Sequence, residues 1–332
     1  MRYLRNTSKD PYFNMAFDEF VLERMDLPCP VFYLWQNSPS VIIGMNQNAY
    51  AEVNIPYLEE NGILPVRRVT GGGAVYHDLQ NLNYTIAGKS SDLDKDYPGY
   101  LHFMVDALRS LGVDASLSGR NDIMVDGRKC SGYAKRVYKD RLMVHGTLMY
   151  DVDLDKLTKA LSVPGSKLSS AGIASVRSKV ANLKDYLPGI SGIEEFQSAL
   201  HEIMSRNEDG SHDAELFLSE SQLREIESFA DSKFRTWEWI YGRSPKAEFR
   251  KSSKFKCGTV EVHYGVNHGL LTDVRFGGDY IGNLPTDELE RLLEGVRDDE
   301  REILKVLRNG RNINEYFDLV TEEEILSLFK VT

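Results

Sequence analysis

Three consecutive glycines at residues 71–73 separate two short segments that have the composition of buried strands. Residues 64–67 precede the glycines, and residues 74–77 follow them with apolar and aromatic side chains. Glycine has no Cβ, so a run of three allows sharp turns and a close approach of the backbone to a neighbouring group. No helical pattern opens directly after the run. The glycines are therefore predicted to join two strands of a sheet.

Further strands are expected where short apolar segments are flanked by turn-forming residues. These segments are rich in β-branched or aromatic side chains, as buried strands are. They cover residues 31–35, 41–43, 84–87, 123–125 and 142–150. Turn residues at 126–127 and 139–141 connect the last of these segments into a meander, and Lys129 lies close to one of its hairpin bends.

Two helices are predicted in the same part of the chain. The first covers about residues 10–25, because Asp10 is a capping residue before Pro11 and apolar side chains recur on one face. The second covers residues 100–111, stops at Gly112 and is expected to pack on the sheet. A stretch rich in Pro, Gly and Ser at residues 162–172 is interpreted as a long loop.

The pattern changes at residues 241–245, and a second domain is predicted beyond this point. Residues 260–266 alternate apolar and polar side chains before a turn, which indicates a hairpin with one solvated face. An apolar helical stripe follows at Leu289, Leu292, Leu293 and Val296. Residues 321–324 form a capping box before a last short helix. We expect a large domain over residues 1–243 and a small α+β domain over residues 244–332.

Charge and composition exclude several classes of protein. The chain has 40 Lys and Arg against 50 Asp and Glu, a net charge of -10 without a basic tail, which disfavours a nucleic-acid partner. The first residues contain no apolar signal core and no apolar run could span a bilayer, so we expect a cytoplasmic protein without a membrane partner. Cys29, Cys130 and Cys257 are widely spaced, and we expect reduced thiols.

The glycine run also has a chemical interpretation. Arg68 precedes it and supplies a planar fork of donors for phosphate oxygens, while the glycine N–H groups can point at an anion. The segment is not a P-loop, because no Gly-Lys-Ser/Thr ends it, and not a dinucleotide fingerprint, because no helix follows. It suits a nucleotide phosphate. The alternative is a flexible turn whose arginines face solvent.

A second group, residues 121–132, indicates related chemistry. It places Lys129 at a hairpin bend beside small side chains, where its ammonium group can approach the carbonyl and phosphate oxygens of a ligand. The alternative is that Lys129 is a solvated surface charge.

These two groups, in this order and with this separation, resemble the lipoate–protein ligase family. The resemblance implies a fold shared with biotin ligases: an α/β (α+β) mixed sheet with flanking helices as the catalytic domain, and a small, mobile C-terminal α+β domain. It implies ATP-dependent ligation of lipoate to a carrier lysine through lipoyl-AMP. The matching segments are residues 14–19, 68–78, 121–132, 145–148 and 175–180, and a tail from residue 237.

The resemblance also implies roles for single residues. Lys129 is the expected catalytic residue, in contact with the lipoyl carbonyl group and the α-phosphate, and Gly73 is expected to share in lipoate binding. Mg²⁺ is expected to enter with ATP and not through a metal site of the protein. The residues expected to bind ATP and the adenylate are Arg68, Gly71, Gly72, Gly73, Ala74, Val75, Tyr76, Asn81, Asp122 and Lys129.

The expected partners are the lipoyl domains of 2-oxoacid dehydrogenase acyltransferase subunits and the glycine-cleavage H protein, bound by a monomer. Because the surface as a whole is acidic, a basic rim of Lys135, Arg136 and Lys139 is predicted to dock the carrier. Trp35, Val75 and Tyr76 are available to line an apolar slot for the lipoate tail.

Several alternatives stay open at this point. Cys130 beside Lys129 suggests a thiol nucleophile, as in ATP-independent octanoyl or lipoyl transferases, but no neighbouring base is evident and a buried small residue fits better. His77 and His145 are interpreted as hydrogen-bonding groups of the pocket wall and not as metal ligands. A catalytically inactive protein that only binds lipoate or has a regulatory role would lack Lys129 or Arg68, and both are present.

Overall fold

The protein is described by a computed structural model over residues 1–89, 97–118, 122–161, 179–207, 209–212, 214–243, 249–267 and 270–329. The chain forms two compact units, and neither is one continuous stretch of sequence. Unit 1 comprises residues 1–42, 53–66 and 75–236, and unit 2 comprises residues 43–52, 67–74 and 237–332. The glycine run thus belongs to the same unit as the C-terminal part of the chain. The predicted division after residue 243 stays a prediction.

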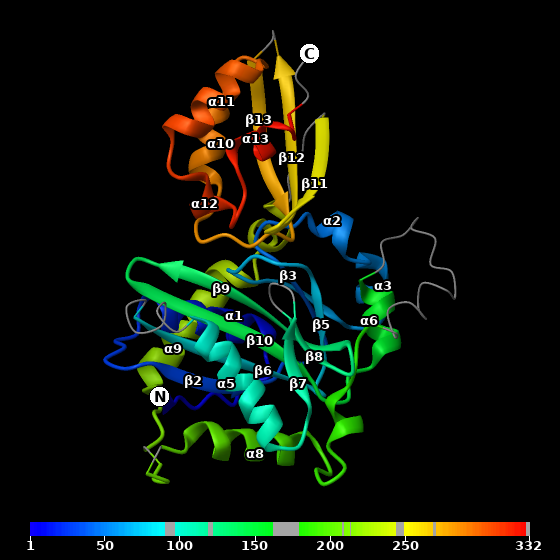
Figure 1. Ribbon diagram of the computed structural model, residues 1–332, viewed down its shortest axis with the longest axis vertical. Helices are drawn as coiled ribbons and strands as arrows, with labels where there is room; N and C mark the ends of the chain where they lie inside the picture. Colours follow the sequence, from blue (N-terminus) through cyan, green and yellow to red (C-terminus); the bar gives the residue numbers. More distant parts are fainter. Residues whose placement is uncertain are drawn as a thin grey trace. The chain divides into compact units, whose positions relative to one another are not determined.

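A seven-stranded mixed sheet forms the centre of unit 1 (Figure 1). The edge pair β1–β2 is parallel, and the other neighbouring strands pair antiparallel. This arrangement confirms the predicted mixed sheet. In spatial order the strands are β1 (Arg2–Tyr3), β2 (Val31–Trp35), β6 (Asn81–Lys89), β10 (Arg141–Met149), β9 (Arg128–Tyr138), β8 (Asp122–Val125) and β7 (Ala115–Ser118).

Helix α1 (Pro11–Glu23) confirms the first predicted helix. The Asp10 side chain accepts hydrogen bonds from the N–H groups of Tyr12 and Phe13, so two donors that the first turn cannot pair internally are satisfied. The helix packs on β6 and β10. Asn14 and Asp18, four residues apart, are buried on it together with the apolar side chains. A helix that buries polar groups must give each of them a partner.

The second predicted helix, α5 (Tyr97–Ser110), ends just before Gly112, whose φ of 91° is easily adopted only by glycine. It packs on β7 and on α8, and Figure 1 shows α5 and α8 on the side of the sheet opposite to α1. Helix α9 and the π-helical η2 pack on α1. The other helices in the described part of this unit are α3 (Ile55–Glu60), α6 (Leu154–Ala160), η1 (Leu183–Tyr186), α8 (Ile193–Ser205), α9 (Glu220–Phe229) and η2 (Ala230–Phe234).

A small sheet with the order β4-β3-β5 carries the glycine run. The run leaves β4 (Leu64–Arg67) and enters β5 (Val75–His77), which confirms that the glycines join two strands. Strand β5 pairs antiparallel with β3 (Ser40–Ile43), with Ile42 opposite Val75 and Val41 opposite Tyr76.

The meander β8–β9–β10 is also confirmed. Asp126 and Gly127 both have positive φ, 49° and 68°, as a two-residue hairpin turn that matches the twist of its strands requires. Lys129 is the second residue of β9, immediately after this turn. The predicted position of Lys129 near a hairpin bend is therefore confirmed.

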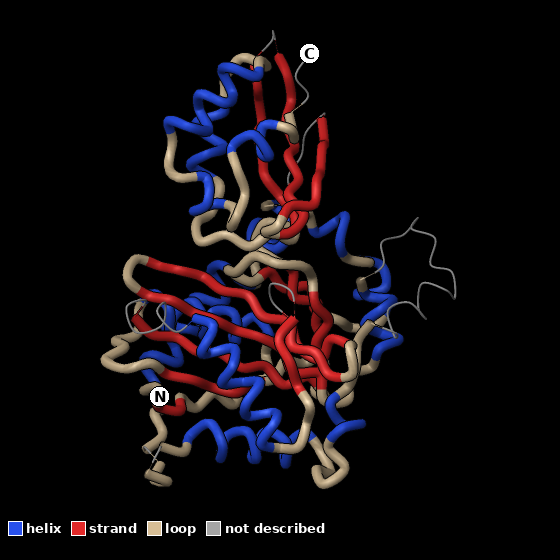
Figure 2. The backbone as a smooth tube through the Cα atoms, viewed as in Figure 1, coloured by secondary structure: helices blue, strands red, loops and turns tan. Residues whose placement is uncertain are grey.

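The C-terminal part of unit 2 is a three-stranded antiparallel sheet with helices on one side (Figure 2). Val260, Val262 and Tyr264 of β12 point into its apolar core, as predicted. The predicted solvated face is wrong, because Glu261 and His263 between them are also buried, where Glu261 pairs with Arg250. The predicted turn at residues 268–269 lies outside the described residues. The strands and helices of unit 2 are α2 (Ala49–Glu52), η3 (Glu238–Gly242), β11 (Phe249–Phe255), β12 (Gly258–Asn267), β13 (Leu270–Gly278), α10 (Asp287–Leu293), α11 (Glu300–Asn309), α12 (Ile313–Tyr316) and α13 (Glu322–Leu326).

The predicted apolar stripe in this region is partly wrong. Leu289 and Leu293 are buried on α10, but Leu292 is 44% exposed and Val296 lies beyond the helix end. The helix stops because Gly295, with a φ of 75°, turns the chain back to the sheet, where the Gly295 N–H donates to Leu271. The capping box at residues 321–324 is confirmed at the start of α13.

Within the described ranges, no helix combines the length and the apolarity needed to cross a bilayer. The long loop predicted at residues 162–172 and the segment at residues 175–178 lie outside the described residues. The cytoplasmic location stays a prediction.

Candidate functional site

The predicted site residues are divided between the two units. Unit 1 holds Val75 and Tyr76 on β5, Asn81 on β6, Asp122 on β8 and Lys129 on β9. Unit 2 holds Arg68, Gly71, Gly72, Gly73 and Ala74. The predicted site residues thus form two groups, one in each unit, and the geometry of each group is defined within its own unit.

Lys129 and Asp122 form an ion pair in unit 1. The Lys129 Nζ lies 2.7 Å from an Asp122 carboxylate oxygen, and the two side chains are 38% and 33% exposed. The backbone of Lys129 is fixed on its other side, because its N–H donates to Lys179 and its carbonyl accepts from Ala181. A register shift between Ile123 and Met124 interrupts the β8–β9 pairing beside this ion pair. Lys129 is therefore a half-exposed cation on a well-anchored backbone.

Cys130 points the other way, into the core. It is fully buried, and its thiol donates to the carbonyl of Ile123 at 3.3 Å. Burial raises the pKa of the Cys130 thiol to about 12. The interpretation of Cys130 as a buried small residue is confirmed.

Because a pKa of about 12 keeps the thiol almost entirely protonated between pH 6 and pH 10, Cys130 supplies very little thiolate there. We expect Cys130→Ser, which retains a donor for Ile123, to keep acyl transfer within about threefold of wild type, a change typical of a residue outside the chemistry. The measurement is the acyl transfer that the family resemblance implies, followed over this pH range. A hundredfold loss with normal folding would restore the thioester alternative.

One face of the central strands carries buried polar side chains. Asn81, Asn83 and Thr85 alternate along β6 and therefore point to the same face, opposite Met149, Thr147 and His145 of β10 in the strand register. The amide nitrogen of Asn81 donates to the side-chain oxygen of Asn83 at 2.9 Å. The side-chain oxygen of Asn81 is itself buried and receives no hydrogen bond from the described residues. A ligand that brings a donor fits this position.

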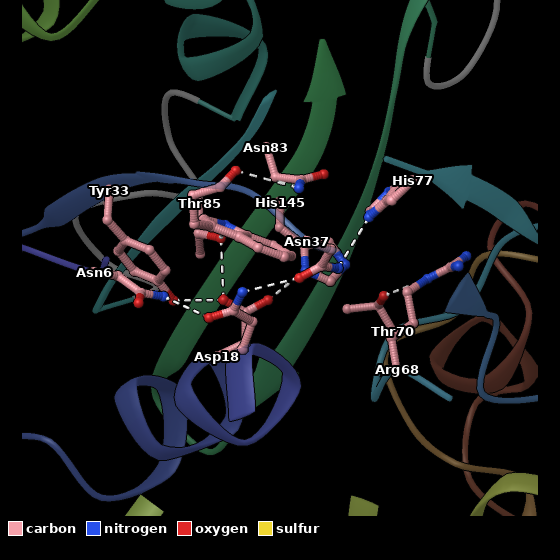
Figure 3. Close-up of polar contacts among 12 residues, drawn as sticks. Asn6, Asp18, Tyr33, Asn37, Arg68, Thr70, His77, Asn83, Thr85 and His145 are labelled. Carbon is pink, nitrogen blue, oxygen red and sulfur yellow. Dashed lines mark hydrogen bonds and ion pairs between the residues drawn. The ribbon is translucent and has the colours of Figure 1, made fainter. Parts of the chain in front are cut away.

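Asp18 of α1 lies at the centre of a buried network on this face (Figure 3). One of its carboxylate oxygens accepts from the Tyr33 hydroxyl at 2.6 Å and from the Thr85 hydroxyl at 3.1 Å. The other lies 2.7 Å from the Nδ1 atom of His145. The Trp35 indole N–H donates to Thr85 at 2.9 Å. The network fixes the ring of His145 and the indole of Trp35, so both are parts of a rigid polar wall.

His77 belongs to a second buried chain of hydrogen bonds. Its Nδ1 lies 3.1 Å from the amide nitrogen of Asn37, whose oxygen accepts from Asn14 at 2.9 Å. Asn14 in turn accepts from Asn6 at 3.0 Å. The hydrogen-bonding roles predicted for His77 and His145 are confirmed. In the described part of the chain, no cluster of three or more His, Cys, Asp or Glu could hold a metal ion.

In the glycine loop, residues 67–74, the Gly72 N–H and the Arg68 guanidinium group are engaged within unit 2. Gly72 has a φ of 90° and its N–H donates to the carbonyl of Tyr280 at 3.2 Å. The guanidinium group of Arg68 donates to the Thr70 hydroxyl (Figure 3). It also donates to the carbonyls of Gly71 and Gly73. Burial lowers the pKa of Arg68 to about 10, so its charge persists at neutral pH. The carbonyl groups of the loop thus bind the loop's own cation, Arg68.

Arg67, adjacent in sequence, has a different role that the sequence does not reveal. It is fully buried, and its guanidinium donates to five carbonyl groups, three in residues 44–47 and two in residues 239–240. The Trp239 indole N–H donates back to the Arg67 carbonyl at 2.8 Å. Arg67 thus joins three separate segments of unit 2, and the alternative in which the arginines face solvent is wrong.

Arg136 of the predicted docking rim is engaged in ion pairs within unit 1, and its role in docking stays a prediction. Its guanidinium forms ion pairs with Glu19 at 3.2 Å and Glu23 at 2.7 Å, and Glu19 also binds Lys233. These groups join β9, α1 and η2 inside unit 1. The roles of Lys135 and Lys139 stay predictions, as does the apolar slot at Trp35, Val75 and Tyr76.

Four residues of these networks were not predicted from the sequence: Asp18, Tyr33, Thr85 and Arg67. A signal for Asp18 was present, because Asn14 and Asp18 share the helical face that also carries Phe17 and Val21. Polar residues at core positions indicate a buried network or a ligand site.

Comparisons with known proteins identify the family of the chain. Residues 10–205 match the family described as "Lipoyl protein ligase A/B catalytic domain", and residues 244–329 match "Bacterial lipoate protein ligase C-terminus". A curated relative, a lipoate-protein ligase of Bacillus subtilis, is 39% identical over 320 residues, which is 96% of each chain.

Solved structures show the same fold. P. falciparum LipL1 in complex with lipoate superposes with a TM-score of 0.79 at 24% identity over 98% of both chains. A structure described as a bi-partite lipoate protein ligase and its E2 lipoyl domain from Thermoplasma acidophilum superposes with a TM-score of 0.65 at 30% identity. The match covers 75% of this chain and 98% of the other. Lipoate-protein ligase A bound with ATP superposes with a TM-score of 0.63 at 30% identity, and the match covers 73% of this chain and 98% of the other.

Proposed function

The chain belongs to the lipoate–protein ligase family, and from this premise we propose that Lys129 carries both halves of an ATP-dependent lipoylation. The supporting observation is the Lys129–Asp122 ion pair, which holds a half-exposed ammonium group on an anchored strand. Asp122 acts as a positioning residue, because its carboxylate orients the Lys129 ammonium group. The second cation, Arg68, belongs to a loop whose glycines can present N–H donors to phosphate oxygens.

In the first half-reaction, a carboxylate oxygen of lipoate attacks the α-phosphorus of ATP, the bond to the bridging oxygen breaks, and pyrophosphate leaves. Two anions approach each other in this step, so cations and N–H donors around the phosphate lower the barrier. Lys129, Arg68 and the N–H groups of residues 71–76 supply them. Mg²⁺ would enter on the phosphates of ATP and neutralise the leaving group.

In the second half-reaction, the amine of a carrier lysine attacks the acyl carbon of lipoyl-AMP. An amide bond forms, the bond from the acyl carbon to the phosphate oxygen breaks, and AMP leaves while the amine loses a proton. Negative charge develops on the acyl oxygen. The Lys129 ammonium would stabilise that charge as it stabilised the phosphate. A single cation serves both steps because the acyl oxygen and the α-phosphate are adjacent in the intermediate.

The proposed carriers are the lipoyl domains of 2-oxoacid dehydrogenase acyltransferase subunits and the glycine-cleavage H protein, bound by a monomer. Family membership supports a lipoyl domain as the acceptor, and the neighbour from Thermoplasma acidophilum is described together with an E2 lipoyl domain. Lys135, Arg136 and Lys139 are the candidates for a basic contact with an acidic carrier.

The experiment that tests the proposal is exchange of labelled pyrophosphate into ATP by the full chain, without a carrier. Exchange that requires lipoate is expected, because the first half-reaction is reversible and needs no carrier. Absence of exchange in the folded wild type, combined with transfer from an acylated donor protein, would contradict the ligase and support an ATP-independent transferase.

A further inference from the structure

The glycine loop of this structure is in contact with the C-terminal part of unit 2. The carbonyl oxygen of Tyr280 accepts the Gly72 N–H at 3.2 Å. A Cβ atom placed on Gly71 would lie 2.4 Å from the same oxygen, so only glycine allows this approach. Arg68 is meanwhile turned onto the loop's own carbonyl groups. The oxygen of Tyr280 and these carbonyls thus hold donors that a phosphate group would need.

The segment that presents the Tyr280 carbonyl is rigid. We call residues 278–280 the accessory turn. The ring of Tyr280 is fully buried in the C-terminal core. The N–H of Asp279 donates to Thr259 at 3.1 Å, and the Asp279 carboxylate accepts the Thr259 N–H. The Gly278 N–H donates to Asn46 at 2.8 Å. The turn cannot leave the loop by a change in its own shape, and it must move with the strands that carry it.

The accessory turn also brings negative charge to the loop. Asp279 is exposed, and its Cβ lies 3.8 Å from the position that a Cβ on Gly73 would occupy. Burial raises the pKa of the neighbouring Glu52 carboxyl group, and the charges of Glu261 and Asp279 raise it further. A carboxylate beside the loop repels a phosphate at the position where the loop would bind it.

We propose that the accessory turn competes with the phosphates of the nucleotide for the glycine loop, so that ATP binds only to molecules in which the turn has left it. The proposal rests on the proposed function in one respect, that the loop is the phosphate site. A competitor within the chain lowers the apparent affinity by the fraction of open molecules. One hydrogen bond to a backbone N–H, together with repulsion by one carboxylate, suffices for a several-fold effect.

A reversible cross-link tests the proposal directly. The 3.8 Å between the two Cβ positions is typical of a disulfide, so the double variant Gly73→Cys with Asp279→Cys is expected to form one on oxidation. We expect the oxidised full chain to bind ATP at least about tenfold more weakly than the same protein after reduction. Peptide mapping identifies the bond, and oxidised wild type is the control. A bond that does not form, or equal ATP affinity in both states, overturns the proposal.

A second variant tests the charge without touching the loop. Asp279→Asn keeps an oxygen that can accept the Thr259 N–H but removes the negative charge, and we expect it to bind ATP about threefold to tenfold more tightly. Asp273→Asn, at an exposed carboxylate of the adjoining strand β13, is the matched control and should leave the affinity unchanged. Unchanged or weaker binding by Asp279→Asn contradicts the competition.

These outcomes are separate from those of the proposed function. ATP binding is measured without lipoate, whereas pyrophosphate exchange requires it. A cross-link that blocks ATP in a protein without exchange supports the competition and contradicts the ligase. Pyrophosphate exchange by the wild type, together with no effect of the cross-link on ATP affinity, supports the ligase and contradicts the competition.

Discussion

Replacement of Lys129 by alanine is expected to lower lipoate-dependent exchange of pyrophosphate into ATP by about 10²–10³-fold, the loss typical of removing one group that stabilises transition-state charge. The side chain is 38% exposed and its ammonium group is paired with the equally accessible Asp122, so stability should change by no more than about 0.5 kcal/mol. The measurements are exchange without a carrier and thermal unfolding. Transfer from preformed lipoyl-AMP to a carrier should fall in parallel.

Two further variants make this test specific. Lys135→Ala removes a cation from the same strand and should leave exchange unchanged, because Lys135 lies away from the β8–β9 turn. Asp122→Asn keeps Lys129 but removes its charged partner, and should give an intermediate loss that differs between kcat and KM. Full exchange in Lys129→Ala would remove Lys129 from the first half-reaction and leave Arg68 as the principal cation.

The second large effect is expected for stability. Asp18→Ala leaves the hydroxyls of Tyr33 and Thr85 and the Nδ1 of His145 without their buried acceptor, and should destabilise unit 1 by about 3–5 kcal/mol. Because the chain has two units, a single unfolding midpoint would mix them. The measurement is therefore hydrogen exchange of the β6 and β10 amides, which lie under Asp18.

Asp26→Ala is the matched control, since Asp26 is exposed just beyond α1 and should change protection by less than about 0.5 kcal/mol. Asp18→Asn retains one acceptor oxygen, so its loss of amide protection should lie between the losses in Asp18→Ala and Asp26→Ala. If β6 and β10 keep wild-type protection in Asp18→Ala, the network orients side chains without contributing to stability.

Local features of this protein were predictable because their causes lie within a few residues. Asp10 and Pro11 start a helix wherever a helix can form there, and the capping box at residues 321–324 does the same for α13. Asp126 and Gly127 adopt positive φ at low cost, so the bend before Lys129 follows from the pair itself. The glycine run could only join extended segments.

The remaining features required the tertiary structure. The sequence presents Arg67 and Arg68 as two equal cations, yet alternation along β4 sends Arg67 into five carbonyl groups from segments up to 173 residues away. Asp18 and His145 are 127 residues apart, and only the packing of α1 on β10 makes them partners. The apolar stripe on α10 was misjudged because Gly295 ends the helix early to return the chain to β13.

The sequence by itself therefore determined the elements and the chemistry available to them: a glycine loop, a lysine after a bend, a mixed sheet with its helices, and a family. The tertiary structure decided which of those groups meet. It placed the glycine loop in the same unit as the C-terminal strands and set the Tyr280 carbonyl on the Gly72 N–H. The physical reason is the separation in sequence of the residues that interact. Caps, turns and glycine conformations are fixed by neighbours in sequence, whereas buried hydrogen bonds and charges depend on which distant segments share a core.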